Sequence, residues 1–277
     1  MIIDSHSHAW RIWPYTPAVP DAESRGVVEQ LLWEMDRWGV DQAVLVCAQI
    51  EHNLHNNDYV ADAVKRYPNR LVQFADVDCQ WSPTYHTPGA AARLAEAAEK
   101  YQLKGFTHYL KDDYDWFESA EGLAFFKTAA EYRLVASLAL NPAWQPALRE
   151  LAARFPEVPF VCHHMGLARV SQPDTLKEVL RSAELPNIYI KLSGFHYASK
   201  TAWDYPQTDT HAQVRALYDA FGPQRLLWGS DYPVVRFFMT YQHALEAFRT
   251  HCRFIPPLDQ ALILGLNLQE LLERAGR

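Results

Sequence analysis

The chain has 277 residues, of which 49% are hydrophobic and 21% are charged, and this composition excludes a small disulfide-stapled scaffold and a wholly disordered chain. Its 33 Asp and Glu residues outnumber 26 Lys and Arg residues, and the net charge of −7 argues against a nucleic-acid-binding protein. Four Cys residues without a C-x-x-C pair indicate a reducing compartment. No apolar stretch approaches the roughly 18 residues of a membrane span, and the N-terminus does not resemble a signal peptide. We therefore expect a cytoplasmic protein that binds neither nucleic acid nor a membrane.

Eight short apolar segments rich in β-branched residues alternate with amphipathic segments. The expected strands are Ile2–His8, Gln42–Ala48, Arg70–Asp78, Leu103–Leu110, Arg133–Leu140, Pro159–Gly166, Asn187–Gly194 and Arg225–Asp231. The expected helices are Glu23–Trp38, Asp58–Tyr67, Gly89–Tyr101, Ser119–Tyr132, Leu148–Phe155, Thr175–Ala183, Thr210–Phe221 and Thr240–His251. Two more helical turns are expected within Leu258–Ala275, packed on the outside of the domain.

This alternation predicts an α/β protein with a parallel sheet, because each helical crossover returns the chain to the same end of the sheet. Eight units of about 30 residues each match a (β/α)₈ TIM barrel. The alternative is a doubly wound open sheet, which usually carries a Gly-rich phosphate loop after its first strand, and the sequence has none. No linker composition divides the chain, so we expect a single domain over residues 1–277.

The first expected strand ends in His6 and His8. Side chains two residues apart on a strand share a face, so both imidazoles point the same way. Catalytic groups of a (β/α)₈ barrel gather at the C-terminal ends of its strands, and two converging imidazoles are half of a first-row metal site. The alternative is a chance H-x-H pattern on the surface.

Asp231 ends the eighth expected strand, two residues before Pro233. In a closed barrel the eighth strand pairs with the first, so closure would bring Asp231 beside His6 and His8. The alternative is an Asp that merely forms a turn.

His163 and His164 follow the sixth expected strand. The two-residue period of a strand predicts that only one of them faces the barrel interior, and that the other points toward the helices or the rim. A single His at a strand end is more often structural than a ligand, so this pair is a weak indication by itself.

In their order and spacing, these segments resemble the amidohydrolase superfamily, in particular its group of lactone hydrolases and related decarboxylases (the amidohydrolase-2 group). The resemblance covers the whole chain. The segments that carry it are Asp4-Ser5-His6-Ser7-His8, His163-His164-Met165-Gly166, Lys191-Leu192-Ser193-Gly194, Gly229-Ser230-Asp231-Tyr232-Pro233 and Gly265-Leu266-Asn267.

The resemblance implies a distorted TIM barrel with a mononuclear site, in which His6, His8 and Asp231 would bind one divalent metal ion, zinc first and manganese second. His164 would bind or polarise the substrate, or serve as a further metal ligand. The chain departs from the family pattern in two places: His163 stands where the family usually has Asp, and the fifth strand has no His. The second departure is similar to lactonase members that work without metal.

Hydrolysis of a cyclic ester needs a base for water and positive character near the carbonyl oxygen. Asp231 is the candidate base and His164 its catalytic partner, while His6 and His8, with or without a metal, complete the electrophile. The candidate substrate-binding residues are Trp10, His108, Lys111, His163 and Arg236.

Each of the remaining candidates has an ordinary alternative. Lys111 and Arg236 could bind a carboxylate of the substrate, or they could be ordinary surface cations. His52 and His55 could form a second pair of metal ligands, although two histidines in a loop more often have no role in metal binding. Lys191 is expected to make an inward hydrogen bond rather than a Schiff base.

We expect a hydrolase that opens a sugar lactone or an unsaturated ring-acid lactone. A metal-dependent decarboxylase of an aromatic or ring carboxylic acid is the alternative, and a non-catalytic ligand-binding barrel is a third hypothesis. The expected partner is a small cyclic molecule, and the sequence is compatible with a homodimer.

Overall fold

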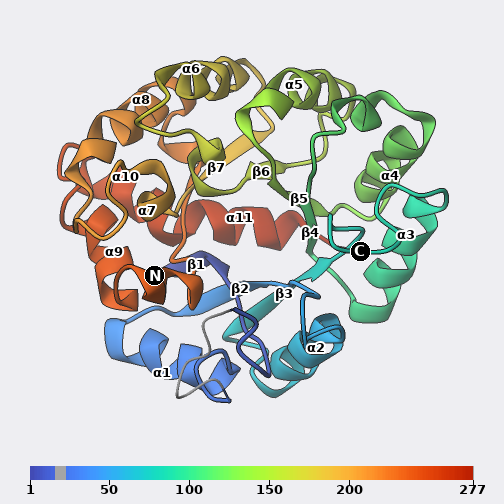
Figure 1. Cartoon of the computed structure of the whole chain (residues 1–277), viewed down its shortest axis with the longest axis horizontal. Helices are drawn as coiled ribbons and strands as arrows, with labels where there is room; N and C mark the ends of the chain where they lie inside the picture. The colour runs from blue at the N-terminus through green and yellow to red at the C-terminus, as the bar shows by residue number, and fades with distance from the viewer. Residues whose placement is uncertain (16–22, 277) are drawn as a thin grey trace.

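Eight parallel strands follow one another around a barrel, and the helices that connect them form an outer layer (Figure 1). The computed structural model describes residues 1–15 and 23–276. The strands are β1 (Ile3–Ser7), β2 (Gln42–Val46), β3 (Leu71–Asp76), β4 (Gly105–Tyr109), β5 (Val135–Ala139), β6 (Phe160–Cys162), β7 (Ile188–Leu192) and β8 (Leu226–Trp228). Each strand lies inside its predicted range, so the single-domain (β/α)₈ prediction is confirmed. Each strand is shorter than its predicted range, and residues such as Ala48, His163 and Ser193 lie beyond the ends of the ladders.

The helices also lie close to their predicted ranges. They are α1 (Val28–Trp38), α2 (Asn56–Arg66), α3 (Ala90–Tyr101), α4 (Ala120–Glu131), α5 (Gln145–Arg154), α6 (Pro173–Arg181), α7 (Phe195–Ala198), α8 (His211–Phe221), α9 (Tyr241–Arg249), α10 (Pro257–Ala261) and α11 (Asn267–Arg274). The sequence pattern gave no sign of α7, a four-residue helix that begins three residues after the end of β7. No helix in the described part of the chain is long and apolar enough to cross a bilayer.

The barrel closes between β1 and the segment after β8 through backbone hydrogen bonds. The amide of Asp231 donates to the carbonyl of His6 at 2.7 Å, and the amide of His8 donates to the carbonyl of Tyr232 at 2.6 Å. Gly229 permits this approach, since a Cβ there would lie 2.8 Å from the Cβ of His6. The β8 ladder ends at Trp228, so closure runs through a loop and the barrel is distorted.

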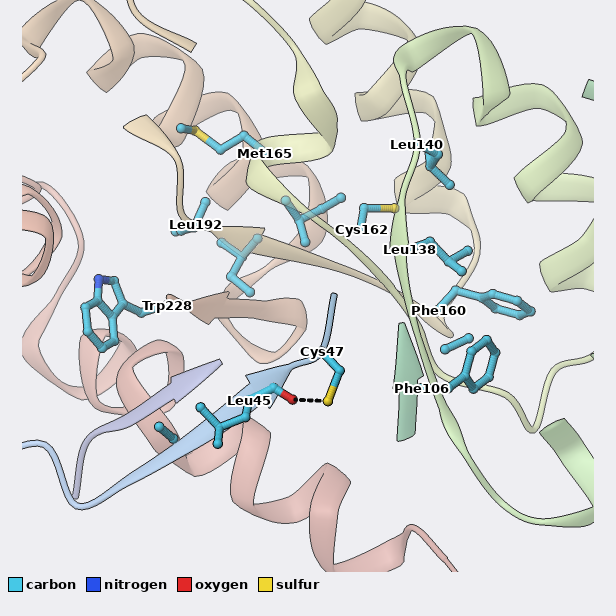
Figure 2. Packing of buried hydrophobic residues seen from close by; sticks show 14 of the residues in the cluster. Leu45, Cys47, Phe106, Leu138, Leu140, Phe160, Cys162, Met165, Leu192 and Trp228 are labelled. Carbon is cyan, nitrogen blue, oxygen red and sulfur yellow. Dashed lines mark hydrogen bonds between the residues drawn. The ribbon is translucent and has the colours of Figure 1, made fainter. Parts of the chain in front are cut away.

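Apolar side chains pack in two regions, outside and inside the ring of strands. Figure 2 shows part of the outer region, where Phe106, Leu138 and Phe160 from neighbouring strands face the helices. The inner region lies at the N-terminal end of the barrel and contains Ile3, Val44, Val46, Phe74, Val135, Val161, Leu227, Leu268, Leu271 and Leu272. The last three come from α11, which crosses behind the barrel in Figure 1.

The C-terminal segment therefore does not pack on the outside as predicted. Leu268, Leu271 and Leu272 are spaced to share one helix face, and that face covers the N-terminal opening of the barrel. Gly265 allows the close packing, because a Cβ there would lie 3.0 Å from the carbonyl oxygen of Met1 and 3.1 Å from the amide of Ile3. With this end closed, the polar interior can open only at the C-terminal ends of the strands.

Candidate active site

His6, His8 and Asp231 meet at the C-terminal end of the barrel, and all three are buried. The Nε2 atoms of His6 and His8 lie 3.2 Å apart. Each of them lies 3.4 Å from Oδ1 of Asp231. Asp231 lies three residues after the end of β8 and adopts a left-handed backbone conformation (φ 60°).

These three atoms have the geometry of one face of a tetrahedral metal site. With zinc–ligand bonds of 2.0–2.1 Å, neighbouring ligand atoms lie about 3.3 Å apart. His8 is also prepared as a ligand: its Nδ1 lies 2.7 Å from the carbonyl oxygen of Val46, which can only accept, so Nδ1 carries the proton and Nε2 a lone pair. The residues present therefore fit a divalent metal with an open coordination position.

His163 and His164 both reach this cluster, so the prediction that only one of them faces inward is wrong. Their ring centroids each lie 4.5 Å from that of His6. The two-residue period does not apply because β6 ends at Cys162, and His164 then adopts a left-handed conformation (φ 46°). Nε2 of His164 lies 3.9 Å from Oδ1 of Asp231, and its Nδ1 lies 3.0 Å from the Ser193 hydroxyl. His6, His163 and His164 form a second group of nitrogen atoms close enough to share a metal ion.

Lys191 and Ser137 lie beneath the imidazoles, inside the barrel. Nζ of Lys191 is 3.0 Å from Nδ1 of His6 and 2.8 Å from the Ser137 hydroxyl. That hydroxyl is 2.7 Å from Nε2 of His163. The expected inward hydrogen bond of Lys191 is confirmed. Ser137 is thus the residue with which β5 contacts this cluster, and β5 contributes no histidine to it.

His196 is a functional candidate that the sequence analysis missed. It lies on α7, and its Nε2 is 3.6 Å from Oδ2 of Asp231. Neither ring nitrogen of His196 has a hydrogen-bond partner, and neither does Oδ2 of Asp231, although all three atoms are buried. Unpaired buried polar atoms that face one another commonly mark the place of a water or a ligand. The sequence signal was present: His196 comes two residues after the Gly194 that ends the family-like segment of the seventh strand.

Tyr197 and Tyr109 complete the surroundings of Asp231 and were also missed as site residues. The ring of Tyr197 lies 5.0 Å from that of His164, and the ring of Tyr109 lies 5.3 Å from that of His163. Burial raises the pKa of both phenols, and the Asp231 carboxylate raises it further. Both hydroxyls therefore stay protonated and can donate hydrogen bonds.

The charges in this cluster are unequal. Burial lowers the pKa of His164 to about 4, although Asp231 opposes this, and it lowers the pKa of Lys191 to about 7. Burial also lowers the pKa of His6, together with the nearby Lys191. Burial alone would raise the pKa of Asp231, but His164, His6 and His8 hold it well below its usual range. The result is an ionised carboxylate beside the neutral imidazoles of His6 and His164.

Trp10 lies against the cluster, whereas His108 does not. The buried Trp10 ring stacks on His8 at 5.0 Å with an interplanar angle of 12°, and its Nε1 donates to the carbonyl of Ala48. His108 lies on the opposite face of β4, where its ring packs against Phe125 and its Nε2 lies 3.0 Å from Nε2 of His86.

The other predicted residues also lie outside the cluster. Lys111 is exposed and its Nζ sits 5.2 Å from the centre of the Tyr85 ring. Arg236 is half-buried, and its positive charge lies near the Tyr232 hydroxyl. His52 and His55 are exposed and belong to neither potential metal group of the described residues.

The sequence of this chain matches the amidohydrolase family profile over residues 3–274. The chain belongs to the amidohydrolase family. It is a hydrolase, and it is similar to a protein named L-fucono-1,5-lactonase from Burkholderia ambifaria, with 28% identity over 96% of this chain and 93% of that protein.

Two solved structures share the fold over nearly the whole chain. One is an amidohydrolase from Burkholderia multivorans with bound zinc, with 21% identity, a TM-score of 0.76 and 99% of both chains covered. The other is a probable 2-pyrone-4,6-dicarboxylic acid hydrolase from Acinetobacter baumannii with bound citric acid, with 22% identity, a TM-score of 0.76, and 98% of this chain and 99% of that one covered. At these identities the two structures support the barrel and not a substrate.

Proposed function

We propose that this amidohydrolase opens a small lactone, with Asp231 as the general base. The observation that carries the proposal is the position of the two Asp231 oxygen atoms. Oδ1 lies among the Nε2 atoms of His6, His8 and His164, whereas Oδ2 is buried and has no partner. One oxygen thus faces the imidazoles, and the other is free to accept a proton from water.

In the proposed reaction, water lies against Oδ2 of Asp231 and attacks the lactone carbonyl carbon as the carboxylate takes its proton. The carbonyl oxygen becomes an oxyanion, for which the protonated hydroxyls of the half-buried Tyr109 and Tyr197 are available donors. The ring C–O bond then breaks, and the leaving alkoxide takes the proton that Asp231 accepted from water, either directly or relayed through His196, whose Nε2 lies 3.6 Å from Oδ2 of Asp231. The atoms balance as one lactone and one water giving one hydroxy acid.

His6, His8 and Asp231 would hold the metal in this site. A bound divalent ion would supply Lewis acidity toward the carbonyl and lower the pKa of bound water. The solved relative with zinc supports zinc as the first ion to test.

For the substrate we favour a sugar lactone. The named relative that covers most of this chain is an L-fucono-1,5-lactonase. Phenolic hydroxyls and stacked aromatic rings beside the cluster, such as Tyr109, Tyr197 and Trp10, suit a ring that carries several hydroxyl groups.

The test is a substrate panel with the metal content controlled. Purified protein is stripped with a chelator, and each sample is assayed with and without added zinc or manganese. The panel contains sugar 1,5- and 1,4-lactones, 2-pyrone-4,6-dicarboxylate and hydroxylated benzoic acids, and a pH indicator reports acid release from the lactones. Turnover of a sugar lactone supports the proposal. Release of carbon dioxide from a benzoic acid without lactone turnover contradicts it and favours the decarboxylase, and saturable binding without any turnover favours a binding protein.

A further inference from the structure

We propose that Lys191 is a positioning residue that keeps His6 a hydrogen-bond donor and thereby weakens metal binding by the His6, His8 and Asp231 site. This inference rests on the metal-binding part of the proposed function, but it is tested without substrate. It separates the two histidines of the H-x-H segment, which look equivalent in the sequence, into one prepared metal ligand and one that must be rearranged.

Lys191 is an unusual residue to find at this position. The residue is 1% exposed, and its amino group forms no ion pair within 4 Å with any residue that the structure describes. Its two hydrogen-bond partners are neutral groups, Nδ1 of His6 and the hydroxyl of Ser137. A buried Lys without a carboxylate partner is costly, so a role in holding its neighbours is the simplest reason for its place.

The hydrogen-bond directions differ between the two histidines. Nδ1 of His8 faces the Val46 carbonyl, which only accepts, so Nε2 of His8 has a lone pair for a metal. Nδ1 of His6 faces the amino group of Lys191, which as an ammonium can only donate, so beside this ammonium Nδ1 of His6 is an acceptor. The proton of neutral His6 then lies on Nε2, the atom that points toward His8 and Asp231.

A metal ion and Lys191 therefore require opposite positions of the proton on the His6 ring. The ion needs the lone pair of His6 Nε2, and this moves the proton to Nδ1, against the hydrogens of the Lys191 amino group. The positive charge carried by a Lys ammonium also repels a dication bound across the same imidazole. Ser137 holds Lys191 from the other side and is itself bonded to His163, so the amino group is fixed in its position.

The experiment compares the zinc affinity of metal-free wild type with that of Lys191→Met and Lys191→Gln, by competition with a chromophoric chelator. Methionine removes the charge and the donor, so zinc should bind at least tenfold tighter. Glutamine offers in addition an amide oxygen that can accept from Nδ1–H of His6, so it should bind zinc tighter than the methionine variant does. Lys104→Met is the matched control, because Lys104 bonds the Leu272 carbonyl at the far end of the barrel, and its zinc affinity should equal that of wild type. Unchanged or weaker binding in both Lys191 variants would overturn the proposal.

A second measurement on the wild type keeps the test decisive if neither Lys191 variant folds. Long-range ¹H–¹⁵N correlation spectra of the histidine rings show which nitrogen carries the proton, and a His6→Gln sample identifies the His6 signals. The metal-free wild type should show His6 protonated at Nε2 and His8 protonated at Nδ1. A His6 ring protonated at Nδ1 would refute the proposed role of Lys191. Neither experiment measures catalysis, so failure of the lactonase proposal leaves both results interpretable.

Discussion

Replacing Asp231 by Asn tests the proposed base with almost no change of shape. The amide keeps one oxygen, which can still face the His6 and His8 nitrogens 3.4 Å away. The amide group cannot take a proton from water at the position of Oδ2. In the wild type, this oxygen has no hydrogen-bond partner among the described residues. General-base catalysis typically contributes 10²–10⁴-fold, so we expect kcat to fall by about that factor, or roughly 2.7–5.4 kcal/mol of activation free energy.

The assay is indicator-monitored lactone hydrolysis at saturating substrate and saturating zinc, so that weaker metal binding does not imitate a loss of chemistry. Circular dichroism in the near and far ultraviolet checks that the variant is folded. Asp41→Asn is the control, since Asp41 accepts from the Ile2 amide at the opposite end of the barrel and should leave kcat unchanged. An Asp231→Asn enzyme that keeps more than a tenth of the wild-type kcat would refute Asp231 as the base.

Three further outcomes are expected. His196→Gln should lower kcat by about 10- to 100-fold with little change in KM if His196 delivers the proton to the leaving alkoxide, and steady-state kinetics with an unchanged kcat would contradict this. Leu268→Ala should lower the free energy of unfolding by about 2–5 kcal/mol in urea titrations and leave kcat unchanged, because Leu268 is buried at the closed end of the barrel. Burial, and secondarily His86, lowers the pKa of His108 to about 4. The neutral His108 ring therefore contributes its full stability above the unfolded-state pKa near 6.5, and this contribution is lost as the pH falls toward 4. This loss is about 3 kcal/mol, so His108→Gln should flatten the decline of the unfolding free energy between pH 7 and pH 4.5, and parallel curves for the two proteins would disprove it.

The fold followed from local patterns in the sequence. Each observed strand lies inside an apolar segment that the sequence marks, since buried parallel strands are short apolar runs between helices. The pairing of Asp231 with His6 and His8 also followed, because a closed barrel brings its first and last strands together whatever the chain between them contains. The two-residue period did not predict side-chain directions correctly beyond the ends of the strands. It failed for His163 and His164 because β6 ends at Cys162, before both residues, and because the left-handed backbone conformation of His164 turns its ring inward.

The sequence by itself determined the barrel, its order of strands and the three residues that meet where it closes. Only the tertiary structure decided what surrounds them. His196 and Tyr197 lie on a helix of four residues, too short to give a periodic signal, and His108 sits on the outer face of its strand. Lys191 lies on β7, Ser137 on β5 and His163 directly after β6, and only closure of the barrel places them beneath His6 of β1. Residue types and spacing identify which groups can do chemistry, whereas the direction of each hydrogen bond depends on atoms that non-local contacts bring together.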